Sequence, residues 1–166
     1  MNNHKIIASY RHFLKKILEN ITNTGINLCG YRLDHIAYRA ETLNKYKEVM
    51  CELFNVGEMI SEIKRGNQKI SIYRLVHPIH YDRYDIPYFE LLGPKENGTY
   101  KEGYQHIEFV IDTPLLDFIR MYPGISFDTS HINREINPSI ELRFEDNMGV
   151  EFHLIDIGKT VELQSK

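Results

Sequence analysis

The N-terminal part of the chain carries apolar residues at the three- and four-residue spacing of an amphipathic helix. The stripe includes Ile6, Phe13, Ile17 and Ile21. This spacing predicts a helix over residues 5–24 that buries one face. The helix has no counterpart later in the chain.

After this helix, the order of expected elements repeats. The first half predicts a strand, a helix and three strands, at 34–40, from Thr42 to Gly57, and at 59–64, 69–78 and 87–94. The second half predicts the same order, with strands at 105–112, 125–135, 138–145 and 150–156 and a short helix after Thr113-Pro114. We therefore expect one α+β domain over 1–166. Two βαβββ modules, 31–94 and 104–157, would form one curved, mostly antiparallel sheet with helices outside.

Alternation along the strands separates an apolar face from a polar one. In four strands the polar face bears ionisable side chains or tyrosine: His35 with Arg39, Tyr88 with Glu90, His106 with Glu108, and Glu151 with His153. A sheet curved with these faces inward is a cup lined with polar groups. The alternative is the solvated face of an ordinary antiparallel sheet, which is the commoner explanation for any single strand. The matching positions of the two histidines favour a clustered site.

Imidazole and carboxylate groups gathered at one point are typical of a divalent-metal site. The duplication would bring together His35, Glu90, His106 and either His153 or Glu151. Residues two apart lie about 6.6 Å apart along a strand, so His153 and Glu151 are not expected to bind one ion together.

Composition narrows the class of protein. Of 166 residues, 20 are Lys or Arg and 23 are Asp or Glu, a net charge of −3 without a dense basic stripe, which argues against nucleic acid as a ligand. The cysteines, Cys29 and Cys51, have no C-x-x-C spacing, so we expect a reducing compartment, the cytoplasm. No signal peptide and no apolar run of about 18 residues is recognised, so no membrane partner is expected.

Four blocks in this doubled order, DHIAYR (34–39), FELLGP (89–94), QHIEFVI (105–111) and GVEFH (149–153), carry a family likeness. They resemble the vicinal oxygen chelate superfamily, which includes glyoxalase I, extradiol dioxygenases and the bleomycin resistance proteins. Within it the chain is most similar to the YecM family, with further matches at RGNQKISIYRL (65–75) and NPSIEL (137–142). The likeness runs from about residue 5 to residue 162.

The resemblance implies one metal ligand on the first and last strands of each module. These positions are His35, Glu90, His106 and a residue of 150–154. The common pattern ends in glycine followed four residues later by glutamate, but here Gly149 is followed at that distance by His153. We therefore expect His153 as the fourth ligand, around zinc, iron(II), nickel or manganese.

The remaining polar residues are candidates for chemistry on a substrate. Glu151 and Glu108 are candidate proton acceptors. Arg39 is a candidate for holding a substrate carboxylate, or for pairing with Glu108, and Tyr88 is a candidate substrate contact.

The superfamily's shared chemistry implies a small metalloenzyme, a lyase, isomerase or dioxygenase, acting on an oxygen-chelating metabolite. The alternative is a non-catalytic protein of the bleomycin-resistance type that binds or sequesters a small molecule. Four retained ligand candidates favour the enzyme. Both modules lie in one chain, so either a monomer or a homodimer is compatible with a complete site.

Overall fold

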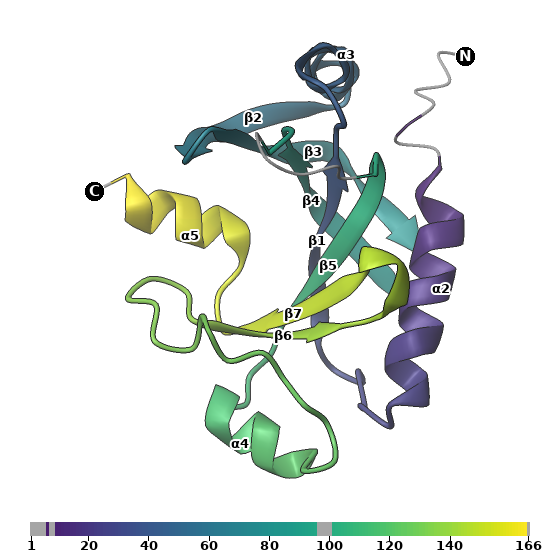
Figure 1. The fold of residues 1–166 in the computed structure, drawn as a ribbon, viewed down its shortest axis with the longest axis vertical. Coiled ribbons are helices and arrows are strands. Elements are labelled where there is room, and N and C mark those ends of the chain that lie inside the picture. The colour runs from purple at the N-terminus through teal and green to yellow at the C-terminus, as the bar shows by residue number, and fades with distance from the viewer. Residues whose placement is uncertain (1–5, 7–8, 96–100, 166) are drawn as a thin grey trace.

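A computed structural model describes residue 6, residues 9–95 and residues 101–165. Its elements in chain order are α2 (Tyr10–Asn23), β1 (Arg32–Arg39), α3 (Leu43–Phe54), β2 (Gly57–Arg65), β3 (Gln68–Tyr81), β4 (Tyr84–Leu92), β5 (Gly103–Val110), α4 (Leu115–Met121), β6 (Ser139–Arg143), the short helix η1 (Glu145–Asn147), β7 (Gly149–His153) and α5 (Ile157–Gln164). The seven strands form one curved sheet in the order β2-β3-β4-β1-β5-β7-β6 (Figure 1). No helix in this part of the chain is long and apolar enough to cross a bilayer.

The sheet consists of two related halves. In the first half β1 runs parallel to β4, and in the second half β5 runs parallel to β7. The other four strand contacts are antiparallel, including the β1–β5 contact that joins the halves. The α+β class, the paired modules and the mostly antiparallel sheet are therefore confirmed.

Most of the core lies between the sheet and the helices on its convex side. Ile17 of α2, Val49 of α3 and Phe118 of α4 are fully buried there, together with the outward-facing strand residues Phe89 and Phe152. The cap expected for α3 is present, because the Thr42 side chain accepts a hydrogen bond from the Lys45 backbone N–H. Apolar periodicity in the sequence thus correctly located this layer.

The strand expected over 125–135 is absent. Only one isolated bridge, Asp128 with Glu141, forms in this segment. The Asp128 side chain instead accepts a hydrogen bond from the Ser130 backbone, and a turn joins Thr129 to Ile132. Turn-forming residues thus prevail over the apolar alternation. The second module is therefore a βαββ unit.

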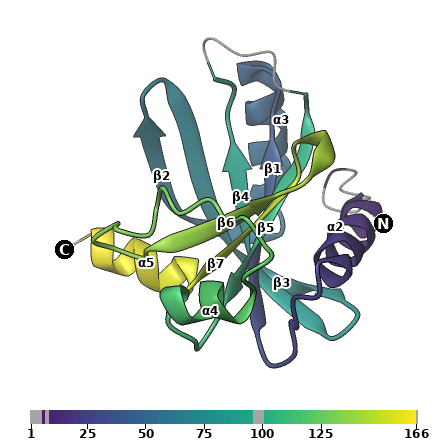
Figure 2. The ribbon, with the colours of Figure 1, turned by 60° about the horizontal axis from the view of Figure 1, so that its bottom comes forward.

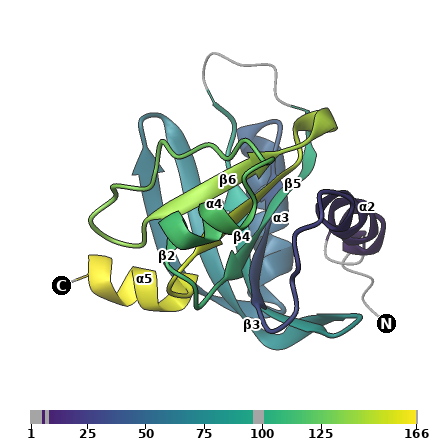
Figure 3. The same cartoon turned by 90° about the horizontal axis from the view of Figure 1, so that it is seen from below.

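Helix α5 was not expected from the sequence. Its N-cap is Asp156, and Ile157 and Val161 pack against a second apolar cluster on the concave face of the sheet. The cluster consists of Ala37, Ile70, Ile72 and Leu92. Figures 2 and 3 show α5 and α2 on opposite sides of the sheet. Helix α5 thus fills part of the hollow of the first module.

Gly158 permits the close approach of α5 to β4. A Cβ atom built at Gly158 would overlap the Tyr88 hydroxyl group. We expect Gly158→Ala to lower the free energy of unfolding by about 2 kcal/mol, measured by urea denaturation. The Tyr88→Phe background, which lacks the hydroxyl, should recover part of this loss. The matched control Gly124→Ala, where the new Cβ meets nothing within 4 Å, should have little effect.

Candidate metal centre

The concave face of the sheet encloses a cavity of about 460 Å³. Ionisable side chains from the central strands line its floor: Glu90, His106, Glu108, Glu151 and His153. Helix α5 and the loop between α4 and β6 form its walls. The predicted polar faces therefore point into a partly open cavity and not onto a flat solvated surface.

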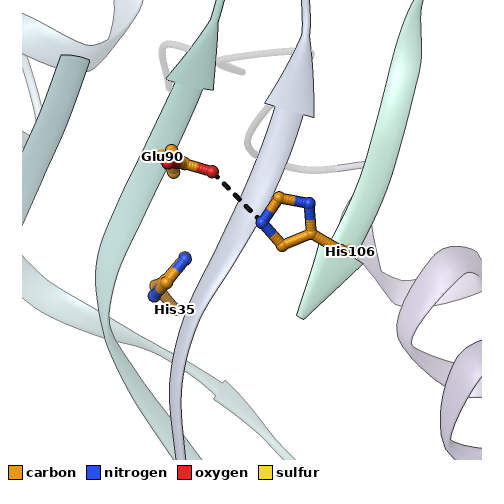
Figure 4. Close-up of side chains that lie close together, drawn as sticks. All are labelled: His35, Glu90 and His106. Carbon is orange, nitrogen blue, oxygen red and sulfur yellow. Dashed lines mark ion pairs between the residues drawn. The ribbon is translucent and has the colours of Figure 1, made fainter. Parts of the chain in front are cut away.

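Three residues from adjacent strands come together here: Glu90 and His106 line the cavity floor, and His35 is not among the described lining residues. His35 of β1, Glu90 of β4 and His106 of β5 each place one potential ligand atom within 4.8 Å of the others. His106 Nε2 lies 3.1 Å from Glu90 Oε2, and His35 faces the same point (Figure 4). His35 is completely buried. The structure thus brings together three of the residues expected from the sequence.

A second group shares His106. It consists of His106, Glu108 and Glu151, whose ligand atoms also lie within 4.8 Å of one another. Glu108 Oε1 is 3.4 Å from His35 Nε2 and 3.5 Å from His106 Nε2. Two imidazoles and three carboxylates therefore surround one small volume.

The carboxylates control the charge of the two histidines. Burial lowers the pKa of His106, but contacts with Glu108 and Glu90 outweigh burial and raise that pKa to about 10. Burial likewise lowers the pKa of His35, but the charge of Glu108 and contact with Asp34 outweigh burial and raise that pKa well above its ordinary value. Both histidines therefore hold protons at neutral pH in the metal-free protein.

Glu151 is about half protonated at neutral pH and more fully protonated at lower pH. Burial and then the negative charge of Glu108 raise the pKa of Glu151 to about 7, although Ser139 Oγ donates a hydrogen bond to Glu151 Oε2 at 2.9 Å. The pKa of Glu108 shifts the other way: burial raises it, but the charge of His35 and contact with His106 hold it well below its usual range.

The pairing of strands identifies which residues are equivalent in the two modules. Ile36 pairs with Ile107, and on either side His35 pairs with Glu108 and Ala37 with His106. A two-fold relation through the Ile36–Ile107 pair therefore exchanges His35 with His106.

The same relation identifies the counterpart of Glu90. His35 pairs with Tyr88, two residues before Glu90, and His106 pairs with Gly149, two residues before Glu151. Glu151 is thus the equivalent of Glu90. His153 is the equivalent of Leu92.

His153 belongs to neither group of potential ligands, although its Nδ1 atom lies 3.7 Å from Glu108 Oε2. Its Nδ1 atom is 2.7 Å from Asn137 Nδ2, and its Nε2 atom is 3.5 Å from Asp34 Oδ2. Burial lowers the pKa of His153 despite the nearby charges of Glu108 and Asp34. The choice of His153 as fourth ligand stays a prediction, and these contacts favour Glu151.

With this geometry in view, relatives of the chain can be compared with it. A family model described as YecM protein matches residues 2–164. The chain belongs to the YecM family. An uncharacterized protein of Haemophilus influenzae (strain ATCC 51907 / DSM 11121 / KW20 / Rd) is 28% identical over 99 residues, which cover 60% of this chain and 52% of that protein. Protein YecM of Escherichia coli (strain K12) is 24% identical over 106 residues, which cover 64% and 56%.

This YecM-family chain spans about half the length of those curated relatives. A solved structure described as Structural Genomics, Protein EC4020 matches it with a TM-score of 0.78 and 23% identity, covering 99% of this chain and 94% of that one. The shared fold is therefore established for nearly the whole YecM-family chain.

Asp34 was not recognised as a site residue from the sequence. Its Oδ2 atom accepts a hydrogen bond from the Ile157 backbone N–H at 3.0 Å and lies 3.0 Å from His35 Nδ1. Alternation places Asp34 and His35 on opposite faces, but the β1–β5 register shifts between Leu33 and His35. This bulge explains how consecutive residues reach the same site.

Arg39 and Tyr88 differ in their access to the cavity. Arg39 lines it, and donates hydrogen bonds to the Gly93 carbonyl at 3.3 Å and to Gln105 Oε1 at 3.5 Å. Tyr88 lies against Gly158 and is not among the described residues that line the cavity. A substrate contact by either residue stays a prediction.

The donor set of the YecM-family chain fits a divalent metal ion. The Nε2 atoms of His35, His106 and His153 are buried and make no well-aligned hydrogen bond within the described part of the chain. His106 Nε2 lies 3.1 Å from Glu90 Oε2 and His35 Nε2 lies 3.4 Å from Glu108 Oε1, and a divalent metal ion bound by these imidazole and carboxylate groups would supply the missing partner. Asp34 next to His35 Nδ1 is the carboxylate–histidine arrangement that orients a ligand imidazole.

Proposed function

We propose that this YecM-family chain is a divalent-metal-dependent enzyme of the vicinal oxygen chelate type. Its substrate would be a small molecule that presents two neighbouring oxygen atoms, and its reaction that of a lyase, isomerase or dioxygenase. The observation that carries the proposal is the convergence of the fully buried His35 with Glu90 and His106, which line the floor of the cavity. The two-fold relation between the modules supports it, because it supplies a fourth ligand, the carboxylate of Glu151, that matches Glu90.

We assign His35, Glu90, His106 and Glu151 as the metal ligands. Zinc, iron(II), nickel and manganese all accept imidazole and carboxylate donors. Once bound, such an ion would polarise oxygen atoms of the substrate as a Lewis acid.

Glu108 is the proposed proton acceptor. It occupies the position equivalent to Ala37, so the second module carries a carboxylate that the first lacks. Its side chain lines the cavity and lies beside both ligand histidines. A carboxylate in this position is suited to accept a proton from a substrate bound above the floor.

We also propose a cytoplasmic location and a site that is complete within one chain. Cys29 and Cys51 are exposed and unpaired, which suits the reducing cytoplasm. Every proposed ligand belongs to one chain, so a monomer provides a complete site.

Zinc titration tests the proposal. We expect one equivalent of zinc to bind and, at pH 7, to release about two to three protons, because the raised pKa values of His35, His106 and Glu151 keep these groups protonated without metal. Affinity should therefore increase from pH 6 to pH 8. Calorimetry in buffers of different ionisation enthalpy measures the proton count.

The result that would contradict the proposal is equally clear. If the protein binds none of zinc, nickel and iron(II), the proposed enzymatic function is wrong, and the alternative is a non-catalytic protein that binds a small molecule. Zinc binding without proton release would place the ion elsewhere.

A further inference from the structure

The cavity extends well beyond the candidate metal centre. Ser61 of β2 pairs with Ile72, which pairs with Glu90 at the floor. Arg65 lies four residues beyond Ser61 on the same strand face, about 13 Å along the strand, and both residues line the cavity. The cavity therefore has an inner end at Glu90 and an outer end at Arg65.

The loop between α4 and β6, which forms the opposite wall, also extends from the inner end of the cavity to its outer end. Asn137 is held at the inner end by its contact with His153. Three and six residues earlier in the loop, Arg134 and His131 also line the cavity. Figure 1 shows this loop and the end of β2 on either side of α5. Residues distant in sequence thus line the outer end of the same cavity.

The outer end gathers positive charge. Within the described residues, neither Arg65 nor Arg134 forms an ion pair with a carboxylate, whereas Arg143 pairs with Glu141 at 2.9 Å. Burial lowers the pKa of His131, and the charges of Arg134 and Arg65 lower it further, with Asp128 opposing them. Like charges held together in a cavity wall attract a ligand of opposite charge.

Apolar side chains separate the two ends. The residues between them are Ile63, Ile70, Ile72, Ile136 and Val161. The cavity thus offers metal-ligand chemistry, an apolar middle and a cationic rim. A volume of about 460 Å³ is within the range of small-molecule sites.

We propose that the ligand of this cavity is an elongated organic anion whose terminal carboxylate lies between Arg65 and Arg134. Its oxygen-bearing head would lie at His35, Glu90 and His106, and this part rests on the proposed function. Arginine is suited to the anionic end because its planar guanidinium group binds a carboxylate through two parallel hydrogen bonds.

A matched pair of chelators tests the carboxylate site. Hydrocaffeate and ethylcatechol share the same catechol head, and only hydrocaffeate carries a carboxylate. For the zinc-loaded protein we expect hydrocaffeate to bind about tenfold more tightly in calorimetry at low salt, with a smaller difference at high salt. Equal affinities would overturn the proposal while leaving the metal site intact.

Arginine variants test whether the preference for hydrocaffeate over ethylcatechol depends on Arg65 and Arg134. The double variant Arg65→Gln/Arg134→Gln should bind the two probes within about twofold of each other. Arg120→Gln is the control, because Arg120 is exposed on α4, pairs with Asp117 and does not line the cavity. A preference that persists in the double variant would also overturn the proposal.

A second experiment tests the anion site without a metal ion. Sulfate is added to the metal-free protein, and the Nε–H signals of the arginine side chains are followed by NMR. We expect the signals of Arg65 and Arg134 to shift while that of Arg120 does not. If zinc fails to bind, this experiment decides alone, and the absence of selective shifts would refute the anion site.

Discussion

The variant His106→Ala should bind zinc about a thousandfold more weakly than the parent, or not detectably. His106 belongs to both groups of potential ligands and contributes Nε2 at their shared point. Removal of its imidazole group takes away one metal ligand and leaves the carboxylates of Glu90, Glu108 and Glu151 without the positive charge that His106 carries in the metal-free protein. Competition with a chromophoric chelator measures the affinity, and thermal unfolding confirms that the variant is folded. His80→Ala, on the exposed hairpin, is the histidine control.

The same measurement identifies the fourth ligand. If the two-fold relation is the correct guide, Glu151→Gln should lose about a hundredfold or more in zinc affinity, and His153→Gln tenfold at most. The opposite order would restore His153, the ligand expected from the sequence. Glu108→Gln should retain zinc and lose turnover once a substrate is found, which separates a proton acceptor from a ligand.

Asp34→Asn should lower zinc affinity by about ten- to a hundredfold. The parent carboxylate contacts His35 Nδ1 and also accepts a hydrogen bond from the first residue of α5. Asparagine keeps one acceptor oxygen in place of two, so it holds the His35 ring less firmly with Nε2 directed at the metal. Calorimetry measures the affinity, and the NMR signal of the His35 ring N–H shows whether the ring is still held.

Asp156→Asn separates the two roles of Asp34. Asp156 caps α5 by accepting a hydrogen bond from the Lys159 N–H at 2.8 Å, and it forms no hydrogen bond or ion pair with His35. We expect this control to lower the free energy of unfolding by at most about 1 kcal/mol, with zinc affinity nearly unchanged. Were Asp156→Asn to weaken zinc as much as Asp34→Asn does, Asp34 would act only through the helix.

The parts of the site that the sequence predicted are those that depend on regular alternation. His35 and His106 occupy matching strands, and period-two alternation correctly placed both on the concave face. Glu90 followed from the same rule. Strand alternation alone therefore predicts which face a side chain lies on wherever the strands are regular.

The parts that were missed depend on local irregularity or on contacts between distant segments. Asp34 reaches the site through a bulge that alternation does not anticipate. Helix α5 buries only Ile157 and Val161 against its cluster, too few apolar positions for a clear helical period. The choice between Glu151 and His153 required strand register, which a single sequence does not contain.

Helix α5 also gives the cup a direction. Two equivalent modules would build a cup that accepts a ligand equally well in either of two orientations related by half a turn. Because α5 packs on Ala37, Ile70, Ile72 and Leu92 and narrows only the first module's half, those two orientations are no longer equivalent. A segment outside both repeats thereby converts a symmetric scaffold into one that distinguishes the two ends of its ligand.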